Sequence, residues 1–192
     1  MKKALVLSVV LGALSGGVHA QVYLGGSYGL GQTDLNCDGS LFRCSKHNAG
    51  YHFVGGLKLG PSSAIEIGQT HFGTKQLTVS GADRYGPYVI DGELDLQATT
   101  IAVVGRFDIQ PSAAVVLKLG ASKVKATLAS YYQSEKLDAT SESKNSFYWA
   151  VALEHALGAQ LKTTVTAEFT KGQVLDETID GKLLSFGLQY HF

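Results

Sequence analysis

The sequence has few charged residues, few prolines and cysteines, and a single methionine at its first position. Charged side chains make up 17% of the 192 residues, and the 16 basic groups balance the 16 acidic ones. A zero net charge gives no electrostatic basis for binding nucleic acid, so we expect no nucleic-acid partner. The 45% content of hydrophobic residues excludes a disordered chain. The sequence has no heptad pattern, which excludes a coiled coil.

The N-terminus has the pattern of a secretory signal peptide. Lys2 and Lys3 form a positive start, residues 4–14 are uncharged and apolar, and residues 18–20 read Val-His-Ala, with small residues at the cleavage site. The apolar run is shorter than the roughly 20 residues that a membrane-spanning helix needs. We therefore predict a signal peptide over residues 1–20, cleavage after Ala20, and one domain over residues 21–192.

Beyond Ala20 the sequence lacks any apolar run long enough for a helical membrane span. A closed β-barrel is the other structure that satisfies all backbone groups inside a bilayer, and its signature is repeated alternation of polar and apolar residues. The last segment shows this alternation most clearly, since its even positions are apolar and its odd positions are small or polar. Eight segments alternate in this way: 22–30, 51–59, 65–68, 98–107, 113–122, 147–154, 161–170 and 184–192.

The connections between these segments differ in length in a regular order. Tight turns are expected near residues 61, 110 and 158, and long loops over 34–48, 75–93, 124–145 and 171–182. This asymmetry is typical of an all-β, eight-stranded, antiparallel up-and-down transmembrane barrel with short periplasmic turns and long extracellular loops. The phase is unclear in residues 69–74 and 93–97, where a bulge could shift it. A soluble barrel of lipocalin type, with its apolar face inward, is the alternative.

The polar face near the tight turns carries charges of both signs. The turns would place Lys58 opposite Glu66 and Glu154 opposite Lys162. An eight-stranded barrel has an interior only just filled by side chains, and charges buried there must pair. We therefore expect a connected cluster that plugs the lumen rather than an ion relay. Its members are Lys58, Glu66, Arg106, Lys118, Glu154 and Lys162.

The apolar face carries aromatic residues in two zones, as the two interfaces of a bilayer would favour. Phe107, Tyr190 and Phe192 lie near the tight turns, and Tyr28, Tyr51, Phe147, Trp149 and Phe169 lie nearer the long loops. In the first long loop, Cys37 and Cys44 are expected to form a local disulfide in an exported protein. The nearby Asp38 and His47 do not complete a recognised zinc spacing, and we expect neither a metal nor a cofactor.

These features together resemble small outer-membrane barrels, namely the OmpA-like transmembrane domain, OmpX and the opacity-type surface proteins of Neisseria. The resemblance covers residues 21–192 and is strongest in the C-terminal segment. In that family the terminal alternation implies recognition by the barrel-assembly machinery, and here it consists of Phe186, Leu188, Tyr190 and Phe192. The resemblance also implies periplasmic chaperones, outer-membrane lipid and lipopolysaccharide as partners, a monomeric state, and a location in the outer membrane of a Gram-negative cell.

Three functions remain open at this level. The first is a structural or surface-interaction role carried by the extracellular loops, whose tyrosines are Tyr85, Tyr88, Tyr131 and Tyr132. The second is a narrow pore for small solutes. The third is a lipid-active enzyme, for which His47, His71 and Ser45 could meet at the outer rim. We expect no enzyme, because the seventh segment lacks a His-x-Ser pair and no G-x-S-x-G motif is present.

Overall fold

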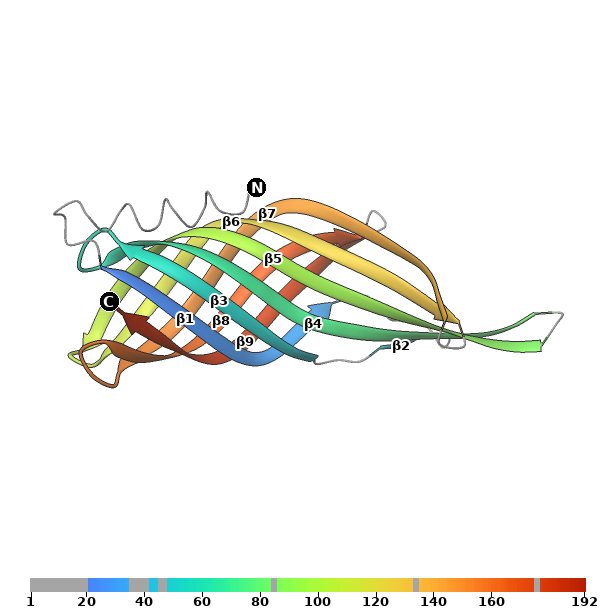
Figure 1. Ribbon diagram of the computed structural model, residues 1–192, viewed down its shortest axis with the longest axis horizontal. Helices are drawn as coiled ribbons and strands as arrows, with labels where there is room; N and C mark the ends of the chain where they lie inside the picture. The colour runs from blue at the N-terminus through green and yellow to red at the C-terminus, as the bar shows by residue number, and fades with distance from the viewer. Residues whose placement is uncertain (1–20, 35–41, 45–47, 84–85, 133–134, 175–176) are drawn as a thin grey trace, which may run out of the picture.

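The computed structural model describes residues 21–34, 42–44, 48–83, 86–132, 135–174 and 177–192, which are almost entirely extended (Figure 1). The nine strands are β1 (Val22–Asp34), β2 (Phe42–Cys44), β3 (Asn48–Lys58), β4 (Ser63–Asp83), β5 (Gly86–Gln110), β6 (Ala113–Tyr132), β7 (Glu135–Ala156), β8 (Leu161–Val174) and β9 (Glu177–His191). Among the described residues, no helix has the length and apolarity needed to span a membrane.

The strands close into a barrel in which each strand pairs antiparallel with its neighbours. The order is β2-β4-β3-β1-β9-β8-β7-β6-β5, and a further β4–β5 pairing closes the ring. The three-residue β2 pairs only with the outer part of β4, so eight strands form the wall. The predicted eight-stranded antiparallel up-and-down barrel is confirmed.

The apolar face of the wall points outward, which distinguishes a membrane barrel from a lipocalin-type barrel. On β5 the side chain of Val103 is 62% exposed and that of its neighbour Val104 is 5% exposed. The outward apolar positions of this strand run from Ile101 to Ile109, which matches the ~9–11 residues of a transmembrane strand. An exposed apolar band of this extent would be unstable in water. The soluble alternative is therefore wrong, and the exposed band is the lipid-facing surface.

The connections at the two ends of the barrel are built differently. Tight turns join β3 to β4, β5 to β6 and β7 to β8, as predicted. The regions expected as long loops over 75–93, 124–145 and 171–182 are instead mostly strand: β4 and β5 stay paired as far as Asp83 and Gly86, and β6 and β7 as far as Tyr132 and Glu135. In the inner part of these segments Leu94, Leu96, Val124 and Ala126 are buried in the lumen, whereas polar residues such as Asp95 and Lys125 alternate with them on the outward face. The apolar outward face that marks the lipid-band strands therefore ends there, which is why the sequence predicted loops for these segments.

A bulge shifts the phase of β4, in the region where the alternation fades. The pairing of β4 with β5 is interrupted between His71 and Thr74, and Gly73 adopts a positive φ of 90°, which glycine tolerates without steric cost. Before the bulge Thr70 points into the lumen, within it Phe72 does, and after it Lys75 does. On β5 the alternation continues through residues 93–97 without a break, because the extra residue of the bulge is on β4 and the pairing of β5 with β6 has no register shift there.

Some predictions concern residues outside the described ranges. The signal peptide and its cleavage site lie within residues 1–20, and Cys37 and Tyr85 are also outside. The signal peptide and the disulfide between Cys37 and Cys44 therefore remain predictions.

Candidate functional site in the lumen and at the outer rim

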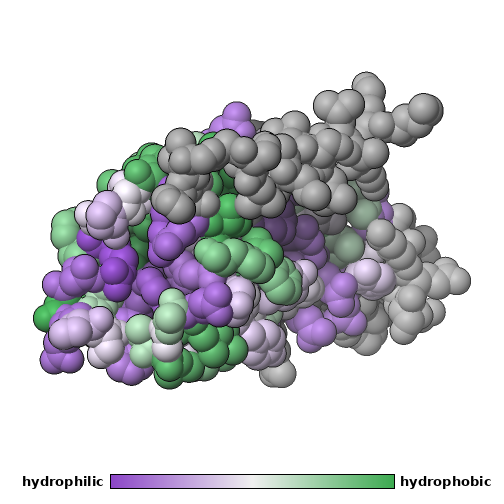
Figure 2. Space-filling view, turned by 60° about the vertical axis from the view of Figure 1, so that its left-hand side comes forward, coloured by the Kyte–Doolittle hydropathy of each residue, from purple (hydrophilic) through white to green (hydrophobic). Residues whose placement is uncertain are grey.

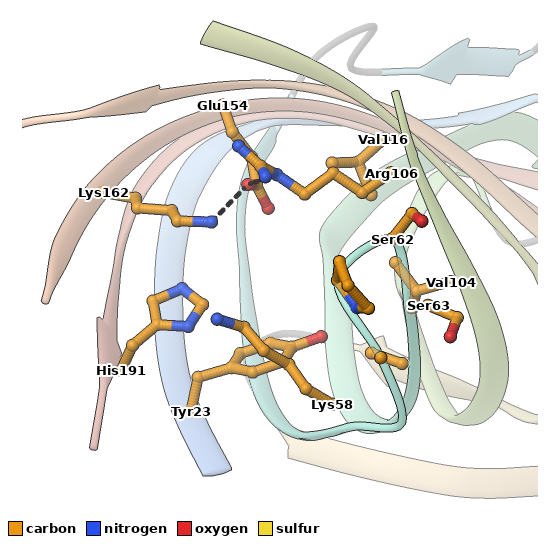
Figure 3. Close-up of a pocket in the computed structure, with 13 residues that line it drawn as sticks. Tyr23, Lys58, Ser62, Ser63, Val104, Arg106, Val116, Glu154, Lys162 and His191 are labelled. Carbon is orange, nitrogen blue, oxygen red and sulfur yellow. Dashed lines mark hydrogen bonds and ion pairs between the residues drawn. The ribbon is translucent and has the colours of Figure 1, made fainter. Parts of the chain in front are cut away.

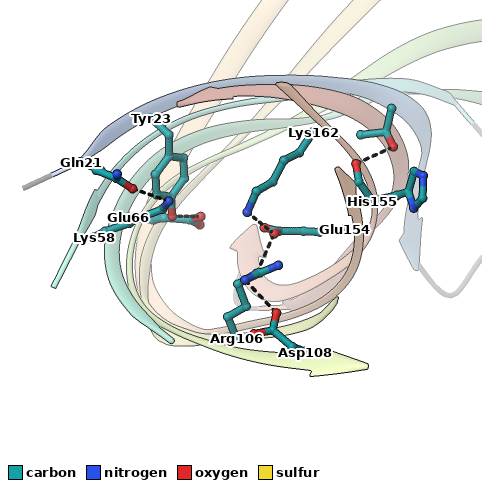
Figure 4. A network of polar contacts seen from close by, with 10 residues as sticks. Gln21, Tyr23, Lys58, Glu66, Arg106, Asp108, Glu154, His155 and Lys162 are labelled. Carbon is teal, nitrogen blue, oxygen red and sulfur yellow. Dashed lines mark hydrogen bonds and ion pairs between the residues drawn. The ribbon is translucent and has the colours of Figure 1, made fainter. Parts of the chain in front are cut away.

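The lumen layer nearest the tight turns is centred on one carboxylate. Glu154 Oε2 accepts hydrogen bonds from Lys162 Nζ at 2.9 Å and from Arg106 Nε at 3.3 Å, and the second side of the guanidinium meets Asp108 at 2.7 Å (Figures 3 and 4). In the register of β7 and β8, Glu154 is opposite Thr164 and Lys162 is opposite Ala156. The expected direct opposition is therefore wrong, but the tight turn brings the side chains of Glu154 and Lys162 into diagonal contact. Figure 2, which brings this end of the molecule forward, shows hydrophilic side chains gathered between hydrophobic ones.

The next layer contains a fully buried ion pair. Lys118 Nζ lies 2.7 Å from Glu66 Oε2, and the two side chains are 3% and 6% exposed. The hydroxyl of Tyr23 donates to the other oxygen of Glu66 at 2.6 Å (Figure 4). The tyrosine ring fits there because Gly56 is opposite, where a Cβ atom would lie 2.1 Å from the ring.

The predicted pairing of Lys58 with Glu66 is wrong. In the register of β3 and β4, Lys58 is opposite Ala64 and Glu66 is opposite Gly56. Lys58 Nζ donates to Gln21 Oε1 at 2.8 Å (Figure 4). The expected single cluster is therefore divided: Glu66 with Lys118 forms one pair, and Arg106, Glu154 and Lys162 form another group.

A third layer holds the buried carboxyl group of Glu168 with a threonine and a histidine beside it. Glu168 is completely buried, and its Oε2 accepts a hydrogen bond from Thr70 at 3.1 Å. His52 Nδ1 lies 2.8 Å from the Thr70 hydroxyl and 3.3 Å from Glu168 Oε1. Sequence reasoning did not include Glu168 or His52 among the lumen residues of interest, although Glu168 stands on the polar parity of its strand. Its buried partners come from strands far away in sequence, which parity does not reveal.

The outer end of the lumen is apolar. Buried hydrophobic side chains from four strands (β4, β5, β6 and β9) pack together there, and they are Phe72, Leu94, Leu96, Ala98, Val124, Ala126, Ile179 and Leu183. Lys75 lies beside this group and donates to the backbone oxygen of Thr33 at 2.9 Å. At the opposite end a pocket of about 30 Å³, lined by Tyr23, Lys58 and His191 among others (Figure 3), has room for about two waters. The described lumen thus consists of stacked polar layers beneath an apolar one.

The outward face places the predicted aromatic residues at the surface of the barrel. Tyr28, Phe107 and Phe147 are more than half exposed, and Trp149 stacks on Phe169 with ring centroids 4.2 Å apart. The four residues of the predicted assembly signal, three on β9 and Phe192 directly after it, are all exposed on the outward face. Among the tyrosines expected in loops, Tyr88 and Tyr132 belong to β5 and β6 instead, and Tyr131 pairs with Asp91 in the wall.

The histidine considered for an enzymatic role has one acidic partner. His71 Nε2 lies 3.3 Å from Asp95 Oδ1, and Tyr51 stacks on its ring at 4.9 Å. Its other ring nitrogen, Nδ1, is buried, and no hydrogen-bond partner for it occurs among the described residues. Ser45 and His47 lie outside those residues. The described part of the rim therefore brings together a His–Asp pair without an adjacent nucleophile.

A closed barrel with an apolar exterior and a packed polar lumen defines the class of integral membrane β-barrels. The family model "Outer membrane protein beta-barrel domain" matches residues 4–192, so the chain belongs to this family. It is an integral protein of the Gram-negative outer membrane. The expected family relationship is confirmed.

Solved structures share the fold at low sequence identity. Ail of Yersinia pestis is 16% identical, with 91% of this chain and 100% of that chain covered and a TM-score of 0.56. Neisserial surface protein A is 10% identical, with coverages of 89% and 97% and a TM-score of 0.63. OprG of Pseudomonas aeruginosa is 9% identical, with coverages of 90% and 96% and a TM-score of 0.58. A search of curated proteins found no match.

Proposed function

We propose that the protein is a closed barrel that binds extracellular macromolecules through the strand pairs that project from the outer membrane. It acts without catalysing a reaction and without conducting solutes. The main support for this proposal is that the lumen is packed, whereas two long strand pairs, β4–β5 and β6–β7, continue beyond the lipid band.

The packing of the lumen supports the absence of conduction. The Glu66–Lys118 pair and the buried Glu168 cross the interior at successive levels, and the apolar group around Phe72 and Leu96 lies above them. A narrow pore would need a continuous hydrated path past charges that are already paired with one another. Moving such a charge away from its partner is costly in a poorly hydrated space.

The projecting strands support a role at the cell surface. The lipid-facing band of β5 ends at Ile101, and its pairing with β4 continues to the last pair, Asp83 with Gly86. At ~3.3 Å per residue, the part of β5 above the band adds roughly 45 Å of strand. Figure 1 shows this green hairpin extending well past the other strands. A ribbon whose backbone is already paired loses less entropy on binding than a loop that must first become ordered.

A sulfated glycan is a suitable first probe for this surface. The solved structures with the same fold include Ail in complex with a heparin analogue, sucrose octasulfate. On this chain the exposed residues Lys123 and Lys125 lie two positions apart on the outward face of β6, where they could contact an anionic polymer. The partners within the cell are those implied by an outer-membrane barrel: the assembly machinery, periplasmic chaperones and outer-membrane lipid, with the protein itself a monomer.

The experiment compares cells that display the full protein with cells that display a variant in which residues 76–93 are replaced by a tight turn. Adhesion to immobilised heparin and to epithelial monolayers should fall strongly in the variant, while heat-modifiable gel migration should show that the barrel still folds. The purified full-length protein should give no stable conductance in planar bilayers. Equal adhesion by both strains would contradict the surface role, and large steady currents would favour the pore.

A further inference from the structure

The barrel wall has a seam between β7 and β8. Their pairing runs from Ala156 opposite Lys162 only as far as Trp149 opposite Phe169. Above this point β7 continues in pairing with β6, and β8 continues in pairing with β9. The two hairpins therefore separate at the outer edge of the lipid band, and Figure 1 shows β6 and β7 extending farther than β8 and β9.

Side-chain hydroxyls bridge the seam where the backbone ladder stops. Thr170 Oγ1 donates to the backbone oxygen of Phe147 at 3.2 Å and lies 2.6 Å from the hydroxyl of Ser122. Ser122 in turn donates to the backbone oxygen of Ser146 at 3.3 Å. Thr170 and Ser122 both point toward the lumen, so these contacts close the seam from inside and leave its outer side hollow.

The hollow is a notch of about 200 Å³ with an aromatic floor and a charged rim. Phe147 and the stacked pair of Trp149 and Phe169 line its lower part. The rim consists of Lys171, Asp180 and Lys182. In the register of β8 and β9, Lys182 is opposite Phe169 and Lys171 is opposite Asp180. Lys171 is 64% exposed, and its Nζ lies 3.9 Å from Asp180 Oδ1, a separation too long for a strong hydrogen bond.

The notch lies at the depth where lipid chains meet lipid headgroups. Phe169 is the last apolar outward residue of β8 and Lys171 is the next outward one, and Leu184 and Lys182 mark the same change on β9. A ligand here needs hydrocarbon to cover the rings and an anion to meet two ammonium groups. The outer leaflet of this membrane consists of a glycolipid that has both parts, because its glucosamine headgroup carries phosphates and acyl chains.

We propose that this notch binds one molecule of lipid A, with a phosphate held between Lys171 and Lys182 and an acyl chain along Phe147, Trp149 and Phe169. Charge-assisted hydrogen bonds to phosphate are about twice as strong as neutral ones, and a phosphate can replace the weakly held Asp180 as the partner of Lys171. The bound lipid would cover the seam from outside. The proposal rests on the outer-membrane location and is independent of the proposed binding of extracellular macromolecules.

The single tryptophan of the protein provides the measurement, because it forms the floor of the notch. The full-length protein in phosphatidylcholine nanodiscs is titrated with bis-phosphorylated lipid A while Trp149 emission is recorded. A saturable blue shift is expected. The double variant Lys171→Gln/Lys182→Gln should bind roughly a hundredfold or more weakly, since each of the two lost contacts to a charged group is worth about tenfold or more. The control is Lys144→Gln, which removes a lysine of β7 that does not line the notch.

Three further measurements test whether the ligand of the notch is lipid A. Dephosphorylated lipid A should bind more weakly than the phosphorylated form, and phosphatidylglycerol should bind more weakly than lipid A. The lipid A that copurifies from cells should decrease in the Lys171/Lys182 double variant and not in the control. Equal titrations for the variant and the unmodified protein would overturn the proposal, and so would equal affinity for phosphatidylglycerol. If the double variant fails to fold, the two single variants are compared in the same way.

Discussion

The buried pair of Glu66 and Lys118 provides the sharpest test of the lumen structure. Glu66→Gln keeps an oxygen that can accept from Tyr23 and removes only the charge, so the ammonium of Lys118 is left buried without its counter-ion. Breaking a buried pair in this way costs about 3–5 kcal/mol. Reversible urea unfolding in lipid vesicles, followed by the emission of Trp149, should show a loss of this size in the free energy of unfolding.

Two comparisons separate burial from simple loss of charge. Asp108→Asn breaks the contact between Arg106 and Asp108, which has the same 2.7 Å separation but an aspartate side chain that is 63% exposed, so it should cost less than about 1 kcal/mol. The double variant Glu66→Gln/Lys118→Met removes both charges and should regain most of the stability lost by Glu66→Gln. The reasoning is refuted if Glu66→Gln costs no more than Asp108→Asn.

Three other predictions concern packing, orientation and assembly. Gly56→Ala would place a Cβ atom 2.1 Å from the Tyr23 ring and should lower the free energy of unfolding by about 1–3 kcal/mol. Gly55→Ala is the control and should cost little, because its Cβ atom would lie 3.4 Å from Leu24 on the outer face. Equal losses of the two variants in urea unfolding would contradict this account. In a variant that lacks Cys37 and Cys44, Lys123→Cys on intact cells should react with a thiol reagent that cannot cross the membrane. Ser62→Cys and Ser112→Cys should not react, because the tight turns face the periplasm. Reaction at either of these two positions would show that the barrel has the opposite orientation. Phe192 is 64% exposed, so Phe192→Ala should lower the outer-membrane level in cells more than stability in refolding, and a parallel fall of both would make it a packing residue.

The sequence predicted the strands best where the two faces of the wall meet different surroundings. Ile101 and Val103 face lipid while Ala102 and Val104 face a packed interior, and this contrast is visible as alternation. Just above the lipid band the contrast is reversed, because Leu94 and Leu96 are buried in the lumen while Asp95 faces outward, so the alternation no longer has the polarity that marks the lipid-facing segments. Pairing there depends on backbone hydrogen bonds and on the tight connection between the strands, which composition does not report.

The lumen contacts were harder to predict because alternation gives the face of a residue but not its direction across the barrel. The partner expected for Glu66 was Lys58, one tight turn away, but its partner is Lys118 on a different hairpin. Thr70 and Glu168 hydrogen-bond although they are 98 residues apart. Only Glu154 and Lys162, eight residues apart across a turn, could be paired from local sequence. Packing in three dimensions decides the remaining contacts.

The order of the layers limits where this protein can act on other molecules. Water can enter from the tight-turn end, where the small pocket lies among Arg106, Glu154 and Lys162, but the apolar group around Leu94 and Leu96 separates those charges from the outer surface. Loss of one polar layer would therefore leave another barrier in place and would destabilise the wall before it opened a path. Selective contacts must then be made by the outward residues, which are the lipid-facing notch at the seam and the strand pairs above the membrane.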